Sequence, residues 1–63
     1  NALIRSVGVG DLIGEVRVAK AGKTARQVRE QDFYRSGVLS VWVQDNSLAP
    51  GERSWVVVVR QKK

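Results

Sequence analysis

Two runs of residues near the end of the chain favour β-strands and constrain the fold more than any other feature. They are Val38–Gln44 (VLSVWVQ) and Ser54–Arg60 (SWVVVVR), and each is rich in valine and carries a tryptophan. The segment between them, DNSLAPGER, is rich in turn-forming residues, and Pro50-Gly51 suits the central positions of a type II turn. We therefore predict two strands joined by a loop, with a β-rich core at this end of the chain.

The run Ser54–Arg60 is apolar on both faces of the strand that it predicts. Successive side chains of a strand alternate between faces, which places Val56 and Val58 on one face and Trp55, Val57 and Val59 on the other. Such a strand is usually central in its sheet and covered on both sides. Because a chain of 63 residues has few apolar residues for this cover, we predict a protein interface at Trp55, Val56 and Val58, with identical subunits or a partner protein.

The first third of the chain predicts two further strands. Ala2–Val9 contains an apolar run, and Leu12–Lys20 alternates between apolar and charged residues, with Asp11 suited to a turn between the two runs. The faces of the second run carry different residues, Val16 and Val18 on one and Glu15 and Arg17 on the other. This alternation is typical of a half-buried strand.

Between the two pairs of strands, the sequence predicts one short helix. Thr24 and Gln27 have the spacing of a capping box, in which a Thr N-cap is followed three residues later by Gln. The residues in Arg26–Tyr34 are mostly helix formers, and Ser36-Gly37 suits the end of a helix. Because the apolar face of this helix is weak, tertiary contacts are needed to hold it.

The order of predicted elements is β-β-α-β-β, which indicates a β-rich α+β fold. All the connections are compatible with antiparallel pairing. Two architectures fit a chain of this size, a small β-barrel of the SH3-like or OB-like type and an open antiparallel sheet of four to five strands with the helix on one face. We predict one small domain that spans residues 1–63.

The composition excludes several classes of protein and of stabilising site. The chain has no cysteine and no histidine, so it cannot form disulfides, and we expect no metal and no cofactor. The lack of cysteine fits a cytoplasmic location, and the chain has no apolar run long enough to span a membrane and no signal-peptide pattern. It begins at Asn1 and contains no methionine, so we expect it to be processed or excised from a longer protein.

No group of residues supports catalysis, and we predict that the chain is not an enzyme. Without histidine or cysteine, the serines lack an obvious activating base. The triplet Gly22-Lys23-Thr24 resembles the end of a phosphate-binding loop, but Arg17 stands where that motif requires a glycine. Glu30 and Asp32 are two residues apart on the predicted helix and do not face each other.

The net charge of +5 points to an anionic partner. Five basic residues lie close together without an acidic residue between them, namely Arg17, Lys20, Lys23, Arg26 and Arg29. Such a patch neutralises phosphates, and Trp42, on a polar strand face, could stack on a base. We therefore predict a non-enzymatic module that binds a polyanion, foremost nucleic acid. The alternative is a structural or assembly module that oligomerises or docks on a partner protein through its C-terminal strands.

Overall fold

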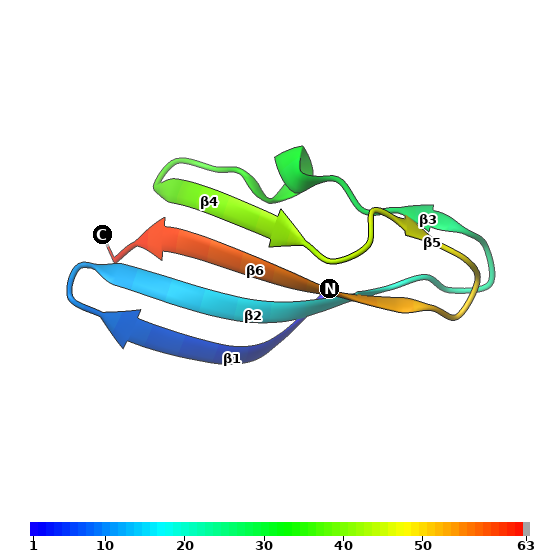
Figure 1. Cartoon of the computed structure of the whole chain (residues 1–63), viewed down its shortest axis with the longest axis horizontal. Coiled ribbons are helices and arrows are strands. Elements are labelled where there is room, and N and C mark those ends of the chain that lie inside the picture. The colour runs from blue at the N-terminus through cyan, green and yellow to red at the C-terminus, as the bar shows by residue number, and fades with distance from the viewer. Residues whose placement is uncertain (63) are drawn as a thin grey trace.

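The computed structural model describes residues 1–62, and its main element is an open sheet of four antiparallel strands (Figure 1). In spatial order these are β1 (Ala2–Val9), β2 (Leu12–Lys20), β6 (Arg53–Gln61) and β4 (Val38–Val43). β1 and β4 form the two edges, and within residues 1–62 they do not pair with each other. The open-sheet alternative of the prediction is therefore confirmed, and no closed SH3-like or OB-like barrel is found in this part of the chain.

The hairpin of β1 and β2 is tight because a glycine starts its turn. Val9 pairs with Leu12, which leaves Gly10 and Asp11 as the connection, and Gly10 has a φ of 57°. A positive φ at the first of two hairpin residues is typical of a type II′ turn, and glycine adopts it without steric cost. The short connection brings the two strands into antiparallel register along most of their length.

The connection between β4 and β6 contains the predicted type II turn and a short strand, β5 (Ser47–Leu48). Gly51 has a φ of 80°, and the Glu52 N–H donates to the Ala49 carbonyl oxygen at 3.0 Å. This geometry confirms that Pro50-Gly51 occupies the central positions of the turn. β6 then runs between β2 and β4, so it is central in the sheet as the sequence predicts.

The helix predicted from Thr24 to Tyr34 is wrong. The segment instead contains the short strand β3 (Arg26–Gln27), which pairs with β5, and one turn of 3-10 helix, η1 (Glu30–Phe33). The Val28 N–H donates to the Asn46 carbonyl oxygen at 2.7 Å, and the Asn46 side-chain amide donates to the Val28 carbonyl oxygen at 2.9 Å. These two bonds require an extended backbone at Val28, whose side chain is buried in the core.

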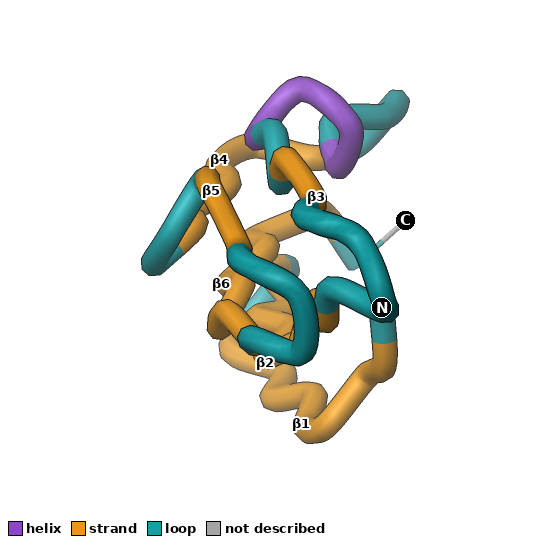
Figure 2. Tube along the Cα trace, turned by 90° about the vertical axis from the view of Figure 1, so that its right-hand side faces the viewer, coloured by secondary structure: helices purple, strands orange, loops and turns teal. Residues whose placement is uncertain are grey.

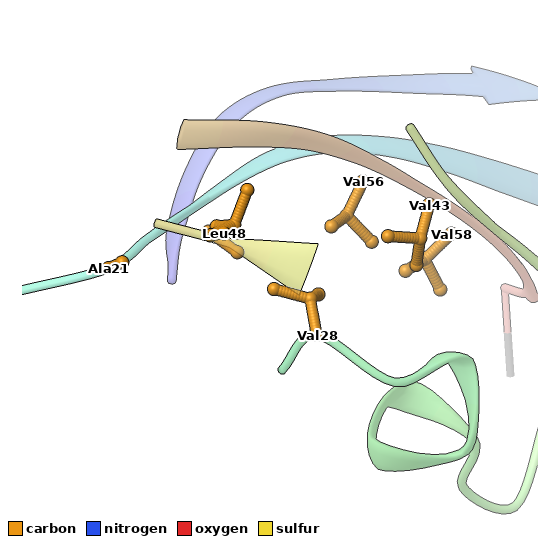
Figure 3. Packing of buried hydrophobic residues seen from close by; sticks show 7 residues of the cluster. Ala21, Val28, Val43, Leu48, Val56 and Val58 are labelled. Atoms are coloured by element: carbon orange, nitrogen blue, oxygen red, sulfur yellow. The ribbon is translucent and has the colours of Figure 1, made fainter. Parts of the chain in front are cut away.

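The core lies between one face of the sheet and the segments that carry β3, β5 and η1. Its buried side chains are Ala19, Ala21, Val28, Val43, Leu48, Val56 and Val58. In Figure 3, Val28 and Leu48 lie opposite the valines of β4 and β6, which closes this face of the sheet. The covering layer is thin because it is made of extended chain and a single helical turn.

The cover does not extend over the whole sheet. In the end-on view of Figure 2, β3 and η1 gather near the β4 side, while β1 lies at the far end. Every residue of β1 is exposed. The same chain therefore has a covered sheet face under β4 and β6, an exposed edge strand, and a second face that none of residues 1–62 covers.

Candidate functional site

The uncovered side of the sheet, which we call the open face, carries mostly apolar side chains. Residues directly opposite each other in neighbouring antiparallel strands point to the same side of the sheet. Val57 of β6 is paired with Val16 of β2 and with Trp42 of β4, and Trp55 is paired with Val18. With the matching positions further along the strands, the apolar residues of the open face are Val7, Val9, Leu12, Val16, Val18, Trp42, Trp55, Val57 and Val59.

The exposed fractions of the side chains on β6 and β4 separate the open face from the core. Trp55 is 46% exposed and Trp42 is 55% exposed, whereas Val56 and Val58 are 0% and 4% exposed. The difference arises because β3, β5 and η1 pack on one side of the sheet alone. The open face therefore presents large apolar side chains to solvent, two of them tryptophans.

The predicted interface residues divide between the two faces of β6. Trp55 lies on the open face, but Val56 and Val58 lie in the core, where Val28 and Leu48 cover them. The sequence indicated that this strand needs apolar cover. On the covered face the chain supplies that cover itself, so the side chains of Val56 and Val58 are buried and do not reach a partner. The residues that remain uncovered are their neighbours on the strand, Val57 and Val59.

The charges at open-face positions have one sign. Arg5 is paired with Val16, and Lys20 is paired with Arg53, so these cations share the open face with the valines and tryptophans. No Asp or Glu occupies an open-face strand position among residues 1–62. The acidic residues lie elsewhere; for instance, Asp45 and Glu52 accept hydrogen bonds from backbone N–H groups in the β4–β6 connection.

A basic groove lies at one end of the open face, where β2 ends and β6 begins. Its volume is about 430 Å³, and it is lined by Asn1, Ala2, Ile4, Val18, Lys20, Arg26 and Arg53. The Arg26 guanidinium donates to the Lys20 carbonyl oxygen at 3.1 Å, which fixes it beside the strand end. An adjoining hollow of about 390 Å³ shares Ile4, Val18 and Arg53 with the groove and reaches Trp55.

The five basic residues predicted to bind nucleic acid do not share a helical face. Lys20 and Arg26 come together in the basic groove, while Lys23 and Arg29 are exposed in the connecting segments. Arg17 lies on the covered face, where its Nε donates to Glu15 at 3.1 Å. Binding of nucleic acid by this set stays a prediction, and the set lacks the continuous helical arrangement on which it was based.

Sequence reasoning missed Arg53 as a member of the basic groove. Arg53 is far from Lys20 in sequence, and the two meet because β2 and β6 are neighbours in the sheet. The only sequence signal was its place at the end of the turn-rich segment, directly before the last predicted strand. The order of strands, which the sequence does not specify, was needed to bring these cations together.

The covered face holds a cluster of ion pairs. The Nε atoms of Arg17 and Arg60 each donate to a different oxygen of Glu15, at 3.1 and 3.0 Å. Burial by itself raises the pKa of Glu15, but the hydrogen bonds and charges of Arg60 and Arg17 outweigh it and lower the pKa below its ordinary value. Beside the cluster is a cavity of about 330 Å³ that Phe33 and Arg35 help to line.

Two further properties of residues 1–62 bear on possible ligands. In this part of the chain there is no group of three or more His, Cys, Asp or Glu side chains with the arrangement of a metal site. None of its helices has the length and apolar character needed to cross a membrane.

Comparison with models of known protein families gives a match. The family model of the TraK C-terminal domain matches residues 4–60, which is nearly the whole chain. The comparisons with curated proteins and with solved structures give no match. The matched residues include both tryptophans, the whole of β2 and β4, and most of β1 and β6.

Proposed function

The chain belongs to the TraK C-terminal domain family, and from this premise we propose that it is a protein-interaction module of a conjugation-related assembly. It binds a partner protein and catalyses no reaction. The observation that carries the proposal is the open face, where two tryptophans and several valines are exposed or partly exposed to solvent. The family match favours this alternative over nucleic-acid binding.

The size and composition of the open face suit a protein partner. The molecule measures 39 × 20 × 14 Å, so its broad side is comparable to the ~800 Å² that each partner contributes to a standard interface. Exposed apolar patches of several hundred Å² on a small protein mark sites of interaction. Covering the exposed half of each tryptophan would contribute about 2–3 kcal/mol, and tryptophan is enriched among residues that dominate binding energy.

The nucleic-acid alternative has weaker support. Interfaces with nucleic acid are much more positively charged than those with protein, whereas the open face of this chain exposes two tryptophans and several aliphatic side chains. One of the five predicted basic residues, Arg17, is already paired with Glu15 on the covered face. Charge alone therefore supports polyanion binding, while the apolar open face and the family match support a protein partner.

The proposal is tested by truncating the tryptophans of the open face in cells whose conjugation system contains this chain. We expect Trp42→Ser with Trp55→Ser to lower plasmid transfer by about 10-fold or more, because hot-spot truncations cost 2 kcal/mol or more of binding energy. Tyr34→Ser is the matched control, since Tyr34 is an aromatic residue of similar exposure (49%) outside the open face. Protein abundance and the circular dichroism of each variant confirm that the chain still folds.

Two outcomes would contradict the proposed function. The first is a wild-type rate of plasmid transfer in cells that carry the Trp42→Ser, Trp55→Ser variant at the same protein abundance as the wild type. The other is tight, salt-sensitive binding of labelled single- or double-stranded DNA that the tryptophan substitutions leave unchanged, because log K falls linearly with log salt when phosphates are neutralised. That second result would restore the polyanion reading.

A further inference from the structure

The open face combines an apolar surface with uncompensated positive charge. Lys20 and Arg53 are directly opposite each other on β2 and β6, and like charges in that arrangement destabilise a sheet. Arg26 adds a third cation at the same end, and no carboxylate is among the residues that line the basic groove. A carboxylate supplied from outside would relieve this repulsion, so the end of the face favours an acidic group.

The open-face strand positions of a second copy of this chain do not supply that group, because they carry no Asp or Glu within residues 1–62. Two open faces stacked with their basic ends together would bring Arg5, Lys20 and Arg53 of one copy near those of the other. Repulsion between these like charges disfavours face-to-face dimers in which the basic ends meet.

The groove combines apolar walls with basic side chains. Ala2, Ile4 and Val18 form its apolar walls, and the adjoining hollow leads from Arg53 to Trp55. Apolar walls reduce the local dielectric constant and strengthen an ion pair, and a guanidinium can bind a carboxylate through two parallel hydrogen bonds. A single protein segment can therefore place an apolar residue near Trp55 and an acidic residue among the cations.

We infer that the occupant of the open face is a segment of a different protein, in which apolar residues are adjacent to one or more Asp or Glu residues. The apolar residues cover the tryptophans and valines, and the acidic residues enter the basic groove beside Lys20, Arg26 and Arg53. This inference rests on the proposed function and names the chemistry of the partner at the same surface.

The inference is tested by selecting peptides that bind the chain from a displayed library of random sequences. Each peptide has about 12 residues, which is longer than a typical strand. Peptides selected on the wild-type chain are expected to combine apolar residues with Asp or Glu. Lys20→Glu with Arg53→Glu is expected to weaken binding of these peptides by about 10-fold or more and to select basic peptides instead. Arg29→Glu with Lys62→Glu is the control, because it changes the net charge equally at exposed residues outside the groove.

The outcomes separate the inference from the proposed function. Selected peptides that depend on Trp55 but carry no excess of Asp or Glu would overturn the inference and leave the proposed function standing. Acidic peptides that bind equally well to Trp55→Ser, or no selected peptides at all, would count against the open face as a docking surface and so against both. A dimer that forms at about 0.15 M salt and is dissociated by Trp55→Ser would make a second copy the occupant and overturn the inference.

Discussion

Glu15 is a nearly buried carboxylate that joins the two central strands on the covered face of the sheet. It lies on β2 and accepts hydrogen bonds from Arg17 on the same strand and from Arg60 on β6. The two guanidinium groups remain partly exposed, so the pairs are screened by water on one side and are worth less than fully buried ones. At the residue scale, the ionisation of this carboxylate is therefore coupled to folding.

Stability is expected to fall on acidification through Glu15. Arg60 and Arg17 outweigh the effect of burial and lower the pKa of Glu15 in the folded chain below its ordinary value of 4.5. A lowered folded-state pKa means that the contribution is fully present above the ordinary value and is lost as the pH falls through the folded-state pKa. Urea unfolding followed by tryptophan fluorescence, at pH values from about 7 to about 2, measures this loss.

Glu15→Gln isolates the contribution of this one group. We expect it to cost about 1–2 kcal/mol near neutral pH, because two partly exposed guanidinium groups lose a charged acceptor. The variant should also lose less stability than the wild type between pH 4.5 and the acid limit, since the other carboxylates are common to both chains. Identical pH dependence of the two chains would show that Glu15 is not coupled to folding.

The sequence predicted part of this residue-scale arrangement. Alternation along Leu12–Lys20 placed Glu15 and Arg17 on the same strand face, and the structure has both on the covered face. Arg60 could not be predicted as their partner, because that pairing depends on β6 lying beside β2. The pairing of Lys20 with Arg53 could not be predicted for the same reason, because it also requires β6 to lie beside β2. Contacts within a strand can be read from spacing, whereas contacts between strands require the order of the sheet.

At the scale of elements, the two faces of β6 differ in how deeply their side chains are buried. Val56 is fully buried and lies in the core, whereas Val57, its neighbour, is on the open face and is only partly covered. Deletion of buried methyl groups costs the transfer free energy together with the cavity that remains. The covered face should therefore be much more sensitive to truncation than the open face.

We expect Val56→Ala to destabilise the isolated chain by about 2 kcal/mol and Val57→Ala by less than about 1 kcal/mol. Both substitutions change the same strand and the same residue type, so the β-propensity change is shared and the difference reports burial. The measurement is the free energy of unfolding from urea titrations at neutral pH. Equal losses would mean that both faces of β6 are covered in solution, contrary to the open face described above.

The segment between β2 and β4 shows why local signals predicted a helix that does not form. Thr24 and Gln27 have capping-box spacing, but this signal concerns only neighbouring residues. In the folded chain Val28 is paired with Asn46 through two hydrogen bonds, and its burial completes the cover of the core. A short helix with a weak apolar face gains less than this extended packing, so tertiary contacts override local propensity.

At the scale of the whole molecule, the chain is a sheet with cover on one side and a positively charged apolar surface on the other. The sequence predicted that Ser54–Arg60 needs cover on both faces, and one of its faces is indeed left open. It could not indicate which face, because that depends on the side to which β3, β5 and η1 cross. The exposed tryptophans and the cations around them then determine how the chain behaves in solution.

The cations of the open face should keep the wild-type chain monomeric until salt screens them. The Debye length falls from about 10 Å at 0.1 M salt to about 3 Å at 1 M, so repulsion between facing copies weakens while apolar burial does not. Sedimentation velocity should therefore show a monomer at the lower salt concentration and association at the higher one. Trp42→Ser with Trp55→Ser should remain monomeric at both, because the apolar contribution is reduced.

Charge reversal in the basic groove should have the opposite effect. Lys20→Glu with Arg53→Glu leaves Arg5 and two new carboxylates on the same face, so two copies can place opposite charges together, and association should appear at about 0.1 M salt. Arg29→Glu with Lys62→Glu lowers the net charge by the same amount at exposed residues outside the groove and should stay monomeric there. Association of both variants to the same extent would show that net charge, and not the placement of cations on the open face, controls self-association.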